Sequence, residues 1–527
     1  MLATLQIISR SSLRAQMKGI CGYGQLGRSF GLLSDHIEGF NIVLANATDL
    51  QVWSPKRKAV ESLSADAKKR NDDLYWAVLG GSPGNFGILT HVWVRPRKDD
   101  DHPDSRGLRD FCFYTKERLE KVLAVIAEMN DKKDLARDFD ICCTVMSDAN
   151  HCGFLEMLET LKARSKGEKP LKGKEEPLDP DYLDEYMRSK HKEEYADGVD
   201  GLDTSGNPGL MLPVILVYLQ WANVDKNAKF GDNDEADWFT KVRAALLTPV
   251  SDGDKKKEYF FTEFKQTKVN VDWQFVDEKE HTAMSKLTRY WCYKNIREFV
   301  QPYEKRVYVT ERKNLSKKDD VLKKTWPEWA TERIDEIMVD GNEEMNLVVQ
   351  IQPFGGDNSM FNKNGDPSDQ TTHGDHGCHS WRQDISLVQV LDYFYRSADK
   401  EAIHDPAKDK HLITGLEWQA ENDKTAGTTD GNKGFFSEFD RRLLWGSYAR
   451  LTDPDEGTSL DSLHKCYFDT DQKYNDLVEI KKDVDKDHIF TPNSFAVGAK
   501  DAPDKRNLPI RGRGHKAYLE KASGKKQ

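Results

Sequence analysis

Apolar residues recur along this chain at two different spacings, and neither spacing dominates. Alternating, β-branched and aromatic runs predict strands, whereas steps of three and four residues predict helices. Strands are predicted over 40–53 (a hairpin around an Asn-Ala-Thr turn), at the end of 74–96 (after a helical turn and a glycine-rich loop), and over 211–221, 260–271, 345–356 and 386–395. Because strands and helices mix without the regular βαβ order of a doubly wound sheet, we predict an α+β fold.

Helical spacing is clearest after Thr115, at Leu119, Val122, Leu123, Ile126 and Met129. The segment 281–300 and the first half of 473–498 show the same period. Charged stretches separate these elements. We expect 56–73 to be a loop or short helix, 97–107 to be a polar break and first domain boundary, and 164–209 to be a charged surface insertion.

Charge and hydropathy exclude some classes of binding partner and do not change the predicted fold. The chain of 527 residues has a formal net charge of −11, which argues against a general polyanion binder, so no nucleic-acid partner is predicted. Only the tail 500–527 is basic, and we expect it to be a flexible, solvated segment. No run of about 18 apolar residues occurs, so no membrane span is predicted.

The first segment, 1–18, is left unassigned. It carries Arg10, Arg14 and Lys18, several serines and no acidic residue, which suits an organelle transit peptide or a gene-model artefact and is too polar for a secretory signal. The eight cysteines form no C-x-x-C pattern, and the two sequons, at Asn46 and Asn314, are short enough to arise by chance. The compartment therefore stays unknown.

Gly22-Tyr-Gly24-Gln-Leu-Gly27 spells G-x-G-x-x-G, the dinucleotide-binding fingerprint. A Rossmann site needs a buried strand directly before this motif and a helix directly after it. Residues 14–21 are no buried strand, and Gly31 weakens a following helix, so we reject the Rossmann interpretation. Ser82–Gly87 is a second glycine-rich loop. The two loops either cradle one diphosphate from two sides or are turns alone, and the sequence leaves both open.

A histidine-rich cluster is the other candidate site. His373, Asp375, His376, Cys378 and His379 have metal-binding side chains within seven residues. Ligands so close together rarely complete a tetrahedron, and the preceding residues are typical of a solvent loop, so we predict no metal. The chain has no G-x-S-x-G elbow and no P-loop lysine, so hydrolase and NTPase functions lack support.

Several motifs, taken in order, carry a resemblance to a known family. They are Gly22-Tyr-Gly24, Gly31-Leu-Leu-Ser-Asp35, Asp73-Leu-Tyr-Trp-Ala77, Gly80-Gly81, Asn85-Phe-Gly87 and, near the end, KYNDLVEIKKDVDKDHIFTPNSF. Together they resemble the berberine-bridge-enzyme-like flavin oxidases of the vanillyl-alcohol-oxidase superfamily, which have a PCMH-type FAD-binding domain. PFGG at 353–356 and WRQD at 381–384 are further landmarks.

The resemblance implies a partial PCMH-type FAD-binding domain with an inserted substrate domain of antiparallel sheet and helices. The implied boundaries are 19–97 for the second half of the FAD domain, 108–440 for the substrate domain and 441–499 for a segment that returns to the FAD domain. FAD is the implied cofactor, bound with or without a covalent link. The implied cofactor-binding residues are Cys21, Gly22, Tyr23, Gly24, Asp35, Gly84, Asn85, Gly87, Ile88 and Asn493.

The implied reaction is hydride removal from a C–H bond of a carbohydrate, alcohol or secondary metabolite, with electrons passed to oxygen. Such a reaction needs a base, for which Glu438 and Asp440 are candidates, while Gln389 occupies a family base position but cannot accept the proton. The family's N-terminal FAD subdomain has no counterpart before residue 19, and Cys21 directly abuts Gly22. We therefore expect a truncated product, and a non-catalytic truncated paralogue is the alternative function.

Overall fold

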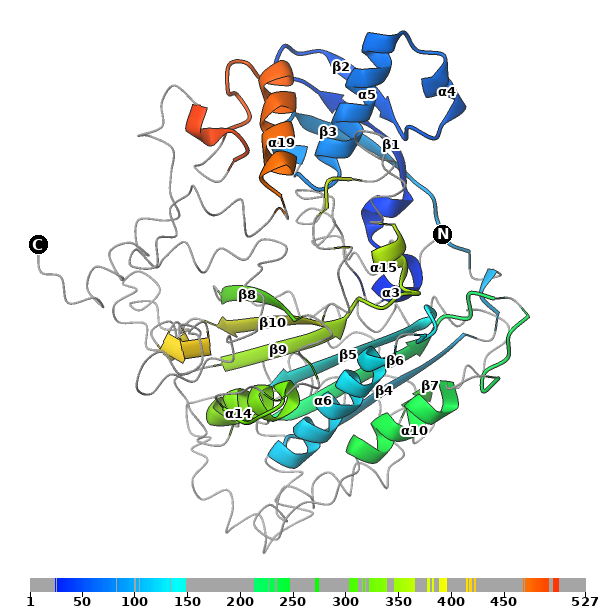
Figure 1. Cartoon of the computed structure of the whole chain (residues 1–527), viewed down its shortest axis with the longest axis vertical. Coiled ribbons are helices and arrows are strands. Elements are labelled where there is room, and N and C mark those ends of the chain that lie inside the picture. Colours follow the sequence, from blue (N-terminus) through cyan, green and yellow to red (C-terminus); the bar gives the residue numbers. More distant parts are fainter. Residues whose placement is uncertain are drawn as a thin grey trace, which may run out of the picture.

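The computed structural model describes most of residues 24–147, 213–246, 303–310, 315–338, 346–364, 377–382, 388–395, 414–422 and 468–501, together with 271–273. The predicted segments 1–18, 164–209 and 281–300, and nearly all of the basic tail, lie outside these residues. Figure 1 shows two sheets, a small one above and a large one below, joined by short helices. All strand pairs between described strands are antiparallel, which confirms the predicted α+β class.

The small sheet has three strands in the order β2-β1-β3. They are β1 (Ile37–Val43), β2 (Asp49–Trp53) and β3 (Ile88–Val94). The predicted hairpin and the strand within 74–96 are therefore confirmed. Helix α5 (Ala65–Val78) follows the short α4 (Lys58–Glu61) and covers one face of the sheet, and η2 (Pro83–Asn85) leads into β3.

The charged segment 56–73 forms more helix than expected, because it supplies α4 and the first two turns of α5. Ser64 caps α5 by accepting a hydrogen bond from the Ala67 backbone N–H. The first half of α5 is polar and solvated, and burial starts only at Asn71 and Asp73 before the apolar run Leu74–Leu79. The helix therefore has no apolar stripe along its first half for the sequence to reveal.

The last described helix, α19 (Asp471–Val484), packs against α5 and the small sheet (Figure 1). Leu477, Ile480 and Val484 lie in one core with Leu74 and Phe40. The helix and Asp-rich turn predicted in 473–498 are confirmed, and η9 (Ala499–Asp501) follows. The domain boundaries at 97, 108, 440 and 499 stay predictions.

The large sheet has seven strands in the order β7-β4-β6-β5-β9-β10-β8. They are β4 (Arg106–Phe113), β5 (Phe139–Met146), β6 (Val214–Trp221), β7 (Val271–Trp273), β8 (Tyr303–Thr310), β9 (Asn346–Pro353) and β10 (Val388–Tyr395). The strands predicted over 211–221, 345–356 and 386–395 are confirmed. The strand predicted over 260–271 lies outside the described residues except for Val271.

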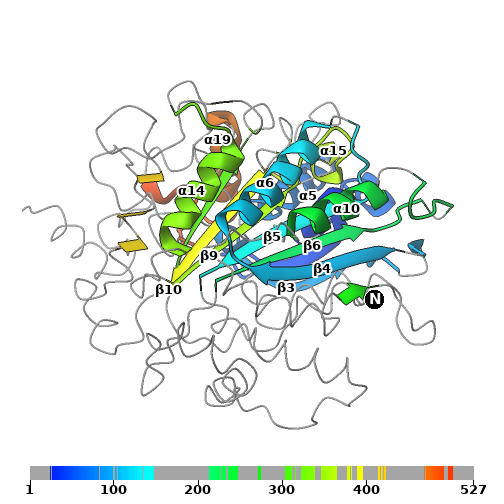
Figure 2. The same cartoon turned by 90° about the horizontal axis from the view of Figure 1, so that it is seen from below.

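Three helices lie side by side on one face of this sheet: α6 (Lys116–Asp131), α10 (Glu235–Leu246) and α14 (Trp326–Met338), as Figure 2 shows. The helix predicted after Thr115 is confirmed, and Thr115 caps it by accepting from the Arg118 N–H at 3.2 Å. Within the described residues, no helix is both long and apolar enough to cross a bilayer.

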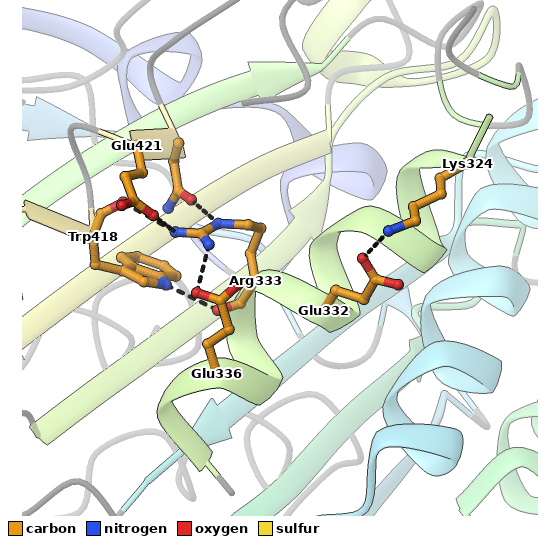
Figure 3. A network of polar contacts seen from close by, with 7 residues as sticks. Lys324, Glu332, Arg333, Glu336, Trp418 and Glu421 are labelled. Carbon is orange, nitrogen blue, oxygen red and sulfur yellow. Dashed lines mark hydrogen bonds and ion pairs between the residues drawn. The ribbon is translucent and has the colours of Figure 1, made fainter. Parts of the chain in front are cut away.

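Helix α14 also fastens the segment 414–422 to the large sheet (Figure 3). The buried Arg333 donates from Nε to Asn422, from Nη1 to Glu336 at 2.6 Å and from Nη2 towards the Trp418 carbonyl at 3.4 Å. Trp418 Nε1 donates back to the Arg333 carbonyl at 2.9 Å. Every nitrogen of this guanidinium is engaged by protein, so Arg333 is a structural clamp.

Candidate functional site

The predicted cofactor-binding residues that the structure describes lie at the two ends of β1. Asp35 lies just before its first residue and Gly24 lies further back in the chain, whereas Gly87 directly precedes β3, whose first residue Ile88 pairs with Val43, the last residue of β1. The strand has 7 residues, so at about 3.3 Å per residue its ends are about 20 Å apart. The strand therefore separates Asp35 from Gly87, and the interpretation in which both glycine loops hold one diphosphate stays a hypothesis. Cys21, Gly22, Tyr23, Asn493, Glu438 and Asp440 lie outside the described residues.

Asp35 forms a buried, two-pronged ion pair with Arg382. Arg382 Nη1 and Nη2 donate to the two carboxylate oxygens at 2.7 and 2.6 Å, and Asn364 Nδ2 and the Leu32 N–H donate at 2.9 and 2.8 Å. Burial alone would raise the pKa of Asp35, but the charge and hydrogen bonds of Arg382 outweigh it and lower that pKa to about 2. With both oxygens held by protein donors, Asp35 fixes the chain around the site.

A second buried cation, Arg28, anchors the first glycine segment to the large sheet. It lies in α3 (Gly27–Phe30) and donates from Nε to the Gly355 carbonyl at 2.8 Å and from Nη1 to the Phe139 carbonyl at 2.5 Å. The Asp140 carboxylate accepts from the Arg28 N–H at 2.8 Å. Burial raises the pKa of Asp140 to about 7 and lowers that of Arg28 to about 10.

The backbone around Arg28 has no room for side chains. A Cβ on Gly27 would come within 2.4 Å of the Phe354 ring, and the Gly24 carbonyl accepts a hydrogen bond from Gln352 at 2.8 Å. These contacts join the glycine segment to the end of β9, near the PFGG landmark. The glycines therefore serve a close approach to the large sheet at this end of the site.

The second glycine loop is held by α19. Asn85 Nδ2 donates to the Gly81 carbonyl at 2.8 Å, and Asn85 Oδ1 accepts from the Val497 N–H at 3.0 Å. Lys481 Nζ donates to the Asn85 carbonyl at 2.6 Å and pairs with Asp485 at 2.9 Å. The C-terminal segment therefore shapes the loop that carries Asn85 and Gly87.

We expect Gly87→Ala to destabilise the protein by about 1–3 kcal/mol because the new methyl group overpacks the sheet. A Cβ at Gly87 would lie 2.6 Å from Ile42 and 2.6 Å from the backbone oxygen of Val43. Gly84 is the matched control, since no atom lies within 4 Å of its Cβ position. Urea unfolding of both variants measures the difference, and equal stabilities would show that Gly87 is a turn residue alone.

The edge of the small sheet beside this loop is open. The Ile88 side chain is 59% exposed, although isoleucine is usually buried. The space above Gly84 is also empty of described atoms. Among the strands that the structure describes, β3 is an edge strand with β1 as its only neighbour.

A cleft of ≈ 670 Å³ lies at the opposite end of β1. Four cationic side chains line it, together with Asp35, Glu38, Tyr75 and Asn364; the cations are Lys56, Arg57, Arg95 and Arg97. These cations do not stand out in the sequence, because they follow β2 and β3 directly and charged residues are typical of strand ends. The motif RPRK after β3 was the available signal.

The remaining candidate residues form no further site among the described residues. Gln389 lies in β10 opposite Gln352 and Val309. The Cys378 thiol is buried in the small-sheet core, with Sγ 3.8 Å from the Ala77 carbonyl, so it is a packing residue. His373, Asp375 and His376 lie outside the described residues, and no group of three potential ligands that could hold a metal occurs in the part the structure describes.

Comparisons with known proteins support the resemblance seen in the sequence. No family model matches the chain. It is 39% identical over 74 residues to aclacinomycin-N/aclacinomycin-A oxidase of Streptomyces galilaeus, covering 14% of this chain and 12% of that protein. It is 30% identical over 102 residues to berberine bridge enzyme-like 12 of Arabidopsis thaliana, covering 17% and 16%. It is 29% identical over 121 residues to the FAD-linked oxidoreductase malF of Malbranchea aurantiaca, covering 22% and 18%.

By name, these relatives are an oxidase, a berberine-bridge-enzyme-like protein and an FAD-linked oxidoreductase, and the resemblance predicted from the motifs is confirmed. The chain matches less than a fifth of the length of each, from 12% to 18%. Solved structures of such oxidases align with TM-scores of 0.42 to 0.46, values too low to argue from.

Proposed function

We propose that this chain is an FAD-linked oxidoreductase of the berberine-bridge-like type. It takes hydride from a C–H bond of a small carbohydrate, alcohol or secondary metabolite and passes the electrons to molecular oxygen. FAD, when bound, supplies the hydride acceptor, and the protein supplies binding and orientation. The observation that carries the proposal is the placement of the family motifs at the two ends of β1, each end in a built set of contacts.

The described residues fit a dinucleotide better than a single phosphate group. FAD has planar ring systems at both ends of a diphosphate chain, so it can reach groups about 20 Å apart that one diphosphate cannot. At one end, the buried Asp35–Arg382 pair fixes the chain just before β1, and Gly24 is half-exposed. At the other end, Gly84 and Ile88 offer open backbone and an exposed apolar side chain to a flat ring.

Each half of the site has a distinct task in this proposal. Asp35 and Arg382 hold the first end rigid, and Lys481 and Asn85 hold the second. Positioning of this kind matters because hydride transfer requires the donor carbon close to its acceptor. Glu438 and Asp440 stay the candidates for the base, and Gln389 can only donate or accept hydrogen bonds. The compartment, which the sequence leaves unknown, has no part in the proposal.

We expect the purified full-length chain to be yellow, or to gain the flavin spectrum when FAD is added. Ile88→Glu places a negative charge at the open edge, so we expect it to weaken FAD binding about tenfold, or about 1.4 kcal/mol. Leu63→Glu is the matched control, because Leu63 is also an exposed apolar residue, at 42%, and lies away from β3.

Flavin fluorescence titration gives both dissociation constants. Flavin absorbance that stays with the protein after denaturation and precipitation identifies a covalent link. A colourless protein that takes up no FAD would contradict the enzyme and favour the non-catalytic alternative. If the Ile88→Glu and Leu63→Glu variants bound FAD with equal affinity, the proposed oxidoreductase activity would not be contradicted, but β3 would not belong to its flavin site.

A further inference from the structure

The cleft at the start of β1 shares Asp35 with the first end of the proposed flavin site, but its four cationic side chains have no role in that proposal. It opens between the small sheet and α15 (Met360–Lys363), with Met360 and Asn364 on its far side. Its ≈ 670 Å³ falls within the range of about 300–1,000 Å³ typical of small-molecule sites.

Four cations and two carboxylates line the cleft, and one carboxylate is already used elsewhere. Asp35 pairs with Arg382, which is not in the lining, so it offers little to the cleft. Glu38 lies 3.7 Å from Arg95 Nε, and both side chains are at least half exposed, so this pair is weak. The lining therefore keeps an excess of positive charge.

Arg97 carries a buried nitrogen that the described residues leave without an acceptor. Its guanidinium carbon lies 5.2 Å from the centroid of the Phe30 ring. Its Nε is buried, and no described group accepts a hydrogen bond from it. Burial, followed by the like charges of Arg95 and Arg137, lowers the pKa of Arg97. A bound anion would supply the missing acceptor and offset the repulsion.

Arg57, another lining residue of the cleft, has its guanidinium group oriented by an aromatic ring. Its guanidinium carbon stacks 3.5 Å from the centroid of the Trp53 ring, and Trp53 in turn contacts Trp93 at 4.7 Å between centroids. Stacking on an indole face fixes the plane of the guanidinium but leaves its N–H groups at the edge for a ligand. Planar guanidinium groups match the paired oxygens of phosphate and carboxylate.

We infer that this cleft is a binding site for a small, multiply charged oxyanion, a phosphate ester or a polycarboxylate, separate from the flavin. Arg57 and Arg97 are its principal contacts, with Arg95 and Lys56 adding charge. The inference goes beyond the proposed oxidoreductase, since it holds whether or not the chain binds FAD. A neutral sugar offers no charge to these cations and is not bound.

Isothermal titration of the full-length chain with pyrophosphate, citrate and glucose at physiological salt tests the site. We expect at least one of the two oxyanions to bind and glucose to give no heat; which oxyanion binds separates phosphate from carboxylate sources. Arg97→Gln is expected to weaken binding at least tenfold. Lys98→Gln removes the same charge from an exposed neighbour that does not line the cleft, so we expect less than a twofold change.

Circular dichroism confirms that the variants are folded, and Arg57→Gln replaces Arg97→Gln if the latter is not. The inference is overturned if neither oxyanion binds, or if the cleft variant and Lys98→Gln bind equally well. It is also overturned if saturating FAD abolishes oxyanion binding, because the cleft then belongs to the flavin site. Oxyanion binding that persists in a chain unable to take up FAD supports the cleft and contradicts only the oxidoreductase.

Discussion

Arg382→Met is expected to lower the free energy of unfolding by about 3–5 kcal/mol, since removing one partner leaves the other as an uncompensated buried charge. Asp35 and Arg382 are both buried, with side chains at most 2% exposed. The methionine cannot donate to Asp35, and the Phe361 carbonyl loses the hydrogen bond from Arg382 Nε at 2.8 Å. The segment 361–364 should loosen from the chain around Asp35.

The acid limb of the stability curve offers an independent check on this pair. Because the folded pKa of Asp35 is lowered from 3.8 to about 2, ionised Asp35 stabilises the fold above about pH 4, and this contribution is lost as the pH falls towards 2. It amounts to about 2 kcal/mol. Asp35→Asn should remove it, so the difference in stability between wild type and variant should shrink on acidification.

Urea unfolding at several pH values measures both effects. Lys68→Met is the control, because Lys68 forms an exposed pair with Asp72 at 2.7 Å and should unfold close to wild type. If Arg382→Met were as stable as this control, the buried pair would contribute nothing to the fold. A double variant, Asp35→Leu with Arg382→Met, should recover part of the loss, since no charge is then buried alone.

The buried charges show where sequence reasoning stops. Strand and helix periods identified β6, β9, β10 and α6 because their apolar faces follow one another along the chain. Arg28 reaches partners more than 100 positions away, at Phe139 and Gly355. Nothing near Arg28 in the sequence marks it as buried, so it reads as a surface residue in a glycine-rich turn.

Strand β5 was missed for a related reason. Its sequence FDICCTVM has an aspartate, Asp140, at the second position, and aspartate is typical of turns. In the structure, the Asp140 carboxylate accepts hydrogen bonds from the N–H groups of Arg28 and Ser29, so Asp140 can be buried inside the sheet. A polar residue in a strand becomes intelligible only when its distant donor is known.

The candidate site residues come from a family resemblance and stay predictions, and their geometry could not be read from the sequence. The family resemblance implies that Asp35, Asn85 and Gly87 bind one cofactor, and the sequence leaves open whether the two glycine-rich loops cradle one diphosphate or are turns alone. The register of β1 against β3 separates them, because antiparallel pairing sends the start of one strand to the end of the next. The lining of the cationic cleft comes from three strand ends, α5 and α15, which no local pattern connects.

Lys481→Met is expected to cost about 3–5 kcal/mol and to release the second glycine loop. The Lys481 and Asp485 side chains are 2% and 0% exposed. Loss of the Lys481 cation leaves the buried Asp485 carboxylate without its partner charge. Asp485 keeps the N–H donors of Ile489 and Phe490 at 2.7 and 2.9 Å. The carbonyls of Asn85 and Phe490 lose their ammonium donor.

Local unfolding then distinguishes this clamp from general destabilisation. Because Lys481 is the link from α19 to the Asn85 carbonyl, amide exchange should accelerate most at Phe86 and Gly87. The matched control is Lys482→Met, the next residue, whose exposed ammonium pairs with Glu479 at 2.9 Å and should change neither stability nor exchange. Uniform acceleration across β1 and α5 in Lys481→Met would contradict a local clamp. Selective release of the loop, with weaker FAD binding, would tie the C-terminal helix to the flavin end of the site.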